Sequence, residues 1–180
     1  MLFRVITKIR TISLCAVLIA VLPSLFSCSR ITAPEEIYVK RDFSAEIRWE
    51  SDGSEYSAKL VTRWLSEEKT SRRIELELTA PERICGVTIE KTGGKATVKV
   101  GDMVAELHNQ TILEAAELLL SDGNFSYKAK AELSGREVIV AERVCENDIS
   151  EIYLDKESGA PLRVVSGGRR IEVVWFEFLD

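Results

Sequence analysis

The fold of this chain is decided by Phe43-Ser44-Ala45-Glu46-Ile47-Arg48-Trp49-Glu50, a stretch in which apolar and polar residues alternate without a break. A period of two is typical of a β-strand with one face buried and the other face in water. Ser51-Asp52-Gly53-Ser54 then predicts a turn. The apolar set continues on a returning strand with Tyr56, Ala58, Leu60 and Trp64.

The same alternation continues along the rest of the chain and predicts about ten short strands. Pro81 is expected to end the third strand, because proline cannot donate a hydrogen bond to the ladder. Gly93-Gly94 and Gly167-Gly168 mark tight hairpins between matched strands. The other expected strands lie within residues 74–78, 87–89, 96–100, 103–107, 127–133, 138–141, 149–155, 162–165 and 171–178.

One helix is predicted in the middle of the chain, over Ile112 to Leu120. Thr111 and Glu114 have the spacing of a capping box, and Gly123 lies just past the helix end. Apolar residues cover nearly the whole circumference of this segment, so we expect it to be buried on most sides. The fold class is therefore mainly β (α+β), with a curved antiparallel sheet or half-barrel meander that wraps one buried helix.

The N-terminus reads as a secretory leader. Arg4, Lys8 and Arg10 precede an apolar run from Ile12 to Leu22. The alternative is a membrane-spanning helix, but a span needs about 20 apolar residues, and Pro23 interrupts this run.

Leu25-Phe26-Ser27-Cys28 follows and matches a bacterial lipobox, in which the Cys carries the acyl chains. We therefore expect residues 1–27 to be a removed signal peptide and 28–42 a lipidated tether. Within the tether, the capping-box spacing of Thr32 and Glu35 predicts a brief helix over Pro34 to Lys40. Residues 43–180 form one antiparallel-sheet domain. Two chains on Cys28, such as palmitate, would hold the protein stably on the extracytoplasmic face of the bacterial cell membrane.

The charge balance argues against one class of partner. The 180 residues carry a net charge of −5, and removal of the three leader cations gives about −8. Binding to a phosphate backbone depends on Lys and Arg displacing counterions. Nucleic acid is therefore not an expected partner.

A family resemblance rests on Ile152-Tyr153-Leu154-Asp155-Lys156-Glu157-Ser158-Gly159-Ala160-Pro161-Leu162-Arg163. The strand ending in Asp, the Ser-Gly turn and the Pro-Leu return resemble the LolA/LolB-type superfamily of lipoprotein carriers. The resemblance implies a curved sheet that wraps helices around an apolar cavity for acyl chains. Some relatives sense stress signals, and one activates a peptidoglycan amidase. The carriers have more helical segments than this chain offers, so its concave face could instead be filled by its own side chains.

The sequence offers no constellation for catalysis. His108 is the only histidine, and a polar loop residue is the favoured interpretation for it. No Ser or Cys lies in a nucleophile motif. We expect no enzyme activity, no cofactor and no metal.

Two cysteines remain in the expected mature domain besides the anchor. Cys85 and Cys145 form a candidate disulfide of an exported protein. The alternative is a pair of buried thiols, since free Cys behaves as a small apolar residue.

Two functions remain for the domain. The favoured one is binding of lipid or lipoprotein acyl chains through a candidate apolar face made by Ile47, Trp49, Leu60 and Trp64. The alternative is an anchored adaptor or regulator that binds another envelope protein, such as a peptidoglycan hydrolase. An open cavity beside the two tryptophans would favour the first function, and packing of these residues against the helix would favour the second.

Overall fold

The computed structural model describes residues 37–108, 112–145 and 148–179. The predicted leader, the lipid attachment at Cys28 and the predicted cap at Thr111 lie outside these ranges. All the strands and helices of the described ranges belong to one compact unit, Ala33–Asp180. A fragment that starts at Ser29 therefore keeps every contact within this unit.

The described chain forms eleven strands, one α-helix and two short 3-10 helices. The helices are η1 Tyr38–Lys40, η2 Glu82–Ile84 and α2 Leu113–Leu120. The strands are β1 Phe43–Ser51, β2 Ser54–Trp64, β3 Arg72–Ala80, β4 Thr88–Thr92, β5 Lys95–Val100, β6 Met103–Glu106, β7 Asn124–Leu133, β8 Arg136–Cys145, β9 Asp148–Asp155, β10 Pro161–Ser166 and β11 Arg169–Phe178.

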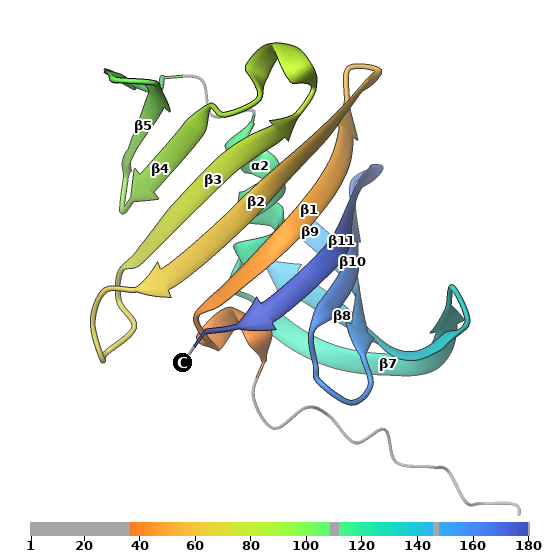
Figure 1. Ribbon diagram of the computed structural model, residues 1–180. Helices are drawn as coiled ribbons and strands as arrows, with labels where there is room; N and C mark the ends of the chain where they lie inside the picture. The colour runs from red at the N-terminus through yellow and green to blue at the C-terminus, as the bar shows by residue number, and fades with distance from the viewer. Residues whose placement is uncertain (1–36, 109–111, 146–147, 180) are drawn as a thin grey trace, which may run out of the picture. The chain divides into compact units, whose positions relative to one another are not determined.

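All eleven strands belong to one antiparallel sheet made of two meanders. The order is β6-β5-β4-β3-β2-β1-β11-β10-β9-β8-β7, so the first and last strands of the chain pair in the middle of the sheet (Figure 1). Every other pairing joins neighbours in sequence. Local connections of at most seven residues are thus enough to build each half, and several of them are the tight turns that the sequence predicted.

Helix α2 connects the two edges of the sheet, because β6 precedes it and β7 follows it. The connection must cross the width of the sheet, and α2 lies against one sheet face (Figure 1). Its buried residues are Leu113, Ala115, Ala116, Leu119 and Leu120. The prediction of a helix buried on most sides is confirmed, although Leu118 is only half-buried.

The core lies between this helix and the inward faces of the strands. In β1 the burial alternates from Ala45 to Glu50 as the sequence predicted, whereas Ser44, expected on the solvent face, is buried. Ile47, Leu60 and Leu76, on three neighbouring strands, are each at most 1% exposed. The expected fold class, a curved antiparallel sheet around one helix, is confirmed, with eleven strands instead of about ten.

The hairpin that carries the family resemblance is held by one carboxylate. Asp155 accepts hydrogen bonds from the backbone N–H groups of Glu157 (3.1 Å) and Ser158 (2.8 Å) and from the Ser158 hydroxyl (2.8 Å). Gly159 completes the turn with a φ of 70°, a conformation that glycine adopts without strain. A short polar turn therefore sets the pairing of β9 with β10.

The segment before β1 differs from a simple tether. Tyr38 and Val39 of η1 are 0% and 1% exposed, so they belong to the domain core. The pattern of alternate residues could not show this, because a single 3-10 turn has no period long enough to read. Residues 38–42, which the sequence analysis gave to the tether, therefore pack as part of the domain.

Candidate functional site

The four residues of the predicted apolar face lie on β1 and β2, and three of them are buried. Ile47 is 1% exposed, Leu60 is 0% exposed and Trp49 is 8% exposed, while Trp64 is half-buried. The pairing of Ile47 with Ala58 places β1 and β2 in matching phase, so their inward residues share one face. This face is filled by side chains of the domain itself.

Trp49 lies at one end of this face, beside helix α2. Its ring stacks on Tyr56 with centroids 5.4 Å apart. Trp49, Ala115, Leu118 and Ile171 line a gap of about 50 Å³. A cavity of this size holds about one or two water molecules, so it is far too small for an acyl chain. A wider hollow of about 540 Å³ also touches Trp49, but most of its lining is charged or polar, including Arg48, Glu55 and Glu172.

Trp64 lies at the other end of the face, where η1 covers the sheet. The Arg72 guanidinium stacks over the Trp64 ring, 4.1 Å from its centroid, and also donates a hydrogen bond to the backbone carbonyl of Val39. Burial of the Arg72 side chain lowers its pKa below the ordinary value. Trp64 is thus packed under Arg72, and the two tryptophans do not meet in one cavity.

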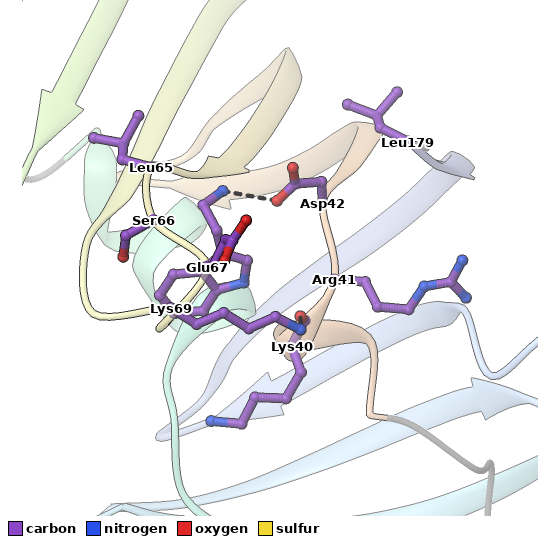
Figure 2. A pocket seen from close by; sticks show the side chains of 9 residues that line it. Lys40, Arg41, Asp42, Leu65, Ser66, Glu67, Lys69 and Leu179 are labelled. Atoms are coloured by element: carbon purple, nitrogen blue, oxygen red, sulfur yellow. Dashed lines mark hydrogen bonds between the residues drawn. The ribbon is translucent and has the colours of Figure 1, made fainter.

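A pocket of mixed polar and apolar lining opens beside Trp64, and Figure 2 shows the residues that line it. It encloses about 500 Å³, and its lining combines charged residues of both signs with apolar ones: Lys40, Arg41, Asp42, Glu67 and Lys69, and Trp64, Leu65 and Leu179. The Asp42 carboxylate accepts a hydrogen bond of 2.7 Å from the backbone N–H of Trp64 (Figure 2). Five charged side chains among nine lining residues distinguish this pocket from the mostly apolar wall of a lipid site, which carries only a few polar groups.

A buried arginine holds the C-terminal end of α2. Arg143 on β8 is 0% exposed, and its guanidinium donates to the backbone carbonyls of Leu118 (2.5 Å) and Ser121 (3.0 Å) and to the Ser150 hydroxyl (3.3 Å). The last carbonyls of a helix have no partner within the helix and carry partial negative charge. Arg143 thus supplies both donors and charge where the helix needs them.

Tyr38 of η1 contacts the same C-terminal end of α2 as Arg143. Its hydroxyl donates a hydrogen bond of 2.6 Å to the Leu119 carbonyl. Burial raises the pKa of Tyr38 to about 12, although the nearby Arg143 opposes the shift. The hydroxyl therefore remains a donor over the whole physiological range of pH.

The ends and flanks of α2 are also tied to the sheet by surface charges. Glu114 pairs with Arg169 of β11 at 3.0 Å, and Glu117 pairs with Lys91 of β4. The helix is therefore attached to η1, β4, β8 and β11. Attachment of α2 to these four elements holds the helix against the sheet, which favours a closed space between helix and sheet.

Known proteins resemble this chain in fold alone. No protein-family profile and no curated protein matches the chain. An uncharacterized conserved protein from Thermus thermophilus matches with a TM-score of 0.50 and 13% identity over 78% of this chain and 80% of that one.

Two other solved structures match less closely. The MucA/MucB complex of Pseudomonas aeruginosa matches with a TM-score of 0.48 and 16% identity over 79% of this chain. A putative outer membrane lipoprotein-sorting protein domain from Vibrio parahaemolyticus matches with a TM-score of 0.40 and 10% identity, over 77% and 85%. The fold resembles the LolA/LolB type. The chain spans only 54% of the MucB structure, and identities this low describe the fold alone.

The sequence analysis missed Arg143, Arg72 and Tyr38. Arg143 has the same phase as the buried Ile139 and Ala141, and Arg72 has the same phase as Ile74. A charged residue in an inward phase was the available signal. Tyr38 gave no such signal, because it stands outside any strand.

The candidate disulfide is not formed, since Cys85 and Cys145 are both free. Cys85 follows η2 in the connection from β3 to β4, and Cys145 ends β8, so five strands separate the two parts of the sheet. Cys85 is also exposed, and the interpretation as two buried thiols does not describe it.

Metal-binding groups and the single histidine are the candidate chemical sites to consider among the described residues. Within them, no group of three or more His, Cys, Asp or Glu side chains could hold a metal ion. His108 is exposed just after β6. In the same part of the chain, no helix has the length and apolar character needed to cross a membrane.

Proposed function

We propose that this chain is a lipid-anchored envelope protein without enzymatic activity, which acts as an adaptor by binding another envelope protein through its outer surface. The filled interior is the observation that carries this choice. Ile47 and Leu60 are at most 1% exposed, and the gap between Trp49 and α2 measures about 50 Å³. Sites for small molecules commonly enclose about 300–1,000 Å³. The wider hollow of about 540 Å³ that also touches Trp49 is lined mainly by charged and polar residues.

The anchor is the acylated Cys28, which places the domain on the extracytoplasmic face of a bacterial membrane. Eight residues separate Cys28 from Ile37, where the described structure begins. An extended chain covers at most about 3.5 Å per residue, so the domain stays within about 30 Å of its anchor. Its partner is therefore a protein at or near the same membrane.

Binding of lipid or lipoprotein acyl chains is the second candidate. Leu118 favours it, because this apolar side chain of α2 is half-buried and lines the gap beside Trp49. Displacement of α2 would widen this gap. Such a movement would have to break the contacts of Arg143 and Tyr38 with the helix end.

A titration separates the two functions. The delipidated fragment from Ser29 to Asp180 is titrated with a fluorescent fatty-acid probe while the tryptophan emission is followed. An adaptor gives no saturable signal, and crosslinking of the anchored protein in cells recovers one envelope protein in stoichiometric amount. Saturable binding that is weakened by Trp49→Glu, but not by the control Trp175→Glu at an exposed position, would support the lipid function instead.

A further inference from the structure

The sheet has two edges, and they differ in how they are protected. β6 and β7 are the outermost strands. An edge strand presents unpaired N–H and C=O groups to other chains, and proteins usually block such an edge with lysines, prolines or a β-bulge, or keep the strand very short. The two edges of one sheet can therefore be compared directly.

The β7 edge carries two of these devices. Lys128 and Lys130 are exposed near the middle of the strand. The pairing with β8 shifts register between Tyr127 and Ala129, which places a bulge at Lys128. A bulge bends and twists the strand, so β7 is a poor template for a further strand.

The β6 edge is short, with four residues, but it carries neither of the two devices of β7. Met103, Val104 and Ala105 are apolar and exposed, with exposed fractions of 72% for Met103 and 61% for Val104. The strand contains no lysine or proline, and its pairing with β5 runs without a register shift. The unpaired backbone groups of an apolar, regular edge strand can pair with a strand of another chain.

The backbone of β6 shows which groups face outward. The N–H of Leu107, one residue past the strand, donates a hydrogen bond of 2.9 Å to the Ala96 carbonyl, toward the side of β5. Backbone groups alternate in direction along an antiparallel strand. The N–H and C=O groups of Val104 and Glu106 therefore point away from β5, toward the open edge.

We propose that the outer edge of β6 binds an extended segment of a partner envelope protein, which adds to the sheet as a further strand. This inference rests on the proposed adaptor function. Strand addition gains affinity from main-chain hydrogen bonds and specificity from the side chains beside them. Exposed Asp102 and Glu106 flank the apolar residues of β6. The segment that fits is therefore apolar in its centre and carries Lys or Arg at its ends, since opposite charges across a strand pair stabilise it.

A peptide that copies Lys95–Val100 provides the probe. This sequence, Lys-Ala-Thr-Val-Lys-Val, already pairs with the inner edge of β6 and has the required basic and apolar residues. The acetylated and amidated peptide is titrated into the isotope-labelled fragment from Ser29 to Asp180 and followed by NMR. We expect saturable shifts of the Val104 and Glu106 amides.

Two matched variants test the site. Val104→Lys gives β6 the protection that β7 has, and it should weaken peptide binding about tenfold or more. Val174→Lys is the control, because Val174 is 53% exposed on β11, a strand paired on both sides. Both valines are exposed, so both variants should fold, and a thermal melt checks this. Equal binding by the Val104→Lys variant, or shifts centred on β7, would overturn the proposal.

Two further readouts identify the occupant. Self-association of the wild type in sedimentation velocity that is lost in Val104→Lys would make the occupant a second copy, and would overturn the proposal of a different partner. Crosslinking in cells separates this inference from the adaptor function. If Val104→Lys still recovers the wild-type partner in full, the edge is the wrong surface and the adaptor function survives. If neither protein recovers a partner, the adaptor function fails, and the edge proposal fails with it.

Discussion

The Tyr38 hydroxyl donates a hydrogen bond of 2.6 Å to the Leu119 carbonyl, across 81 positions of sequence. It joins the residue just ahead of the first strand to the end of the only α-helix in the described part of the chain. Arg143 reaches the same helix end from β8. The closed interior on which the proposed function rests therefore depends on two buried donors.

Tyr38→Phe should change the response of stability to alkaline pH. The folded-state pKa of Tyr38 is about 12 and that of a free tyrosine is about 10, so the folded state holds the proton more tightly. The contribution is fully present below pH 10 and is lost as the pH rises toward 12. By pH 11 the wild type should lose about 1.4 kcal/mol through this residue.

Urea unfolding at pH 8 and pH 11 measures this effect. At pH 8 the Phe variant should be about 1 kcal/mol less stable, because the Leu119 carbonyl loses a donor. The deficit should vanish or reverse at pH 11. Tyr127 and Tyr153 also have raised pKa values, but both proteins retain them. A constant difference at both pH values would contradict the prediction.

Arg143→Met should destabilise the domain by about 2–4 kcal/mol, because it leaves buried helix carbonyls without donors. Relief of the buried charge works in the opposite direction, but the several hydrogen bonds to α2 outweigh it. The control is Arg169→Met, which removes an exposed pair with Glu114 of the same helix and should cost less than about 1 kcal/mol. Denaturant titration compares the two, and equal losses would show that Arg143 does not hold the helix.

Much of this fold could be predicted from the sequence, because apolar and polar residues alternate visibly in strands that have one buried face. β1 and the hairpin at Asp155 show this well. Burial of the helix also followed from its composition. The exact helix start did not, since Ile112 occupies the N-cap position and makes no side-chain cap.

The state of the candidate site could not be predicted in the same way. Alternation places Ile47, Trp49 and Leu60 on one face, but it does not say what covers that face. The answer depends on long-range contacts of Tyr38 and Arg143 with the end of α2. Such contacts leave no local periodic pattern. The same limit applies to Cys85 and Cys145, whose separation depends on the strand order.

Gly123→Ala should destabilise the domain by about 1–3 kcal/mol, the usual cost of overpacking. An added Cβ at Gly123 would lie 2.6 Å from the backbone oxygen of Val144 and 2.9 Å from Cγ of Arg143. Backbone cannot move aside as a flexible side chain can. Gly94→Ala is the control, because nothing lies within 4 Å of its added Cβ. A thermal melt of the two variants should show a clear loss for Gly123→Ala alone.

Cys28→Ala should leave an unlipidated protein that no longer fractionates with membranes through an anchor. A single acyl chain binds a membrane only marginally, whereas two chains anchor it stably, so removal of the proposed acylation site should abolish the attachment. Metabolic labelling with radioactive palmitate and fractionation of cells measure both effects. Cys85→Ala is the matched control, because it removes an exposed thiol of the domain and should keep label and location. A Cys28→Ala protein that still incorporates palmitate and still sediments with membranes would place the anchor elsewhere in the chain. It would also remove the limit of about 30 Å on where the adaptor finds its partner.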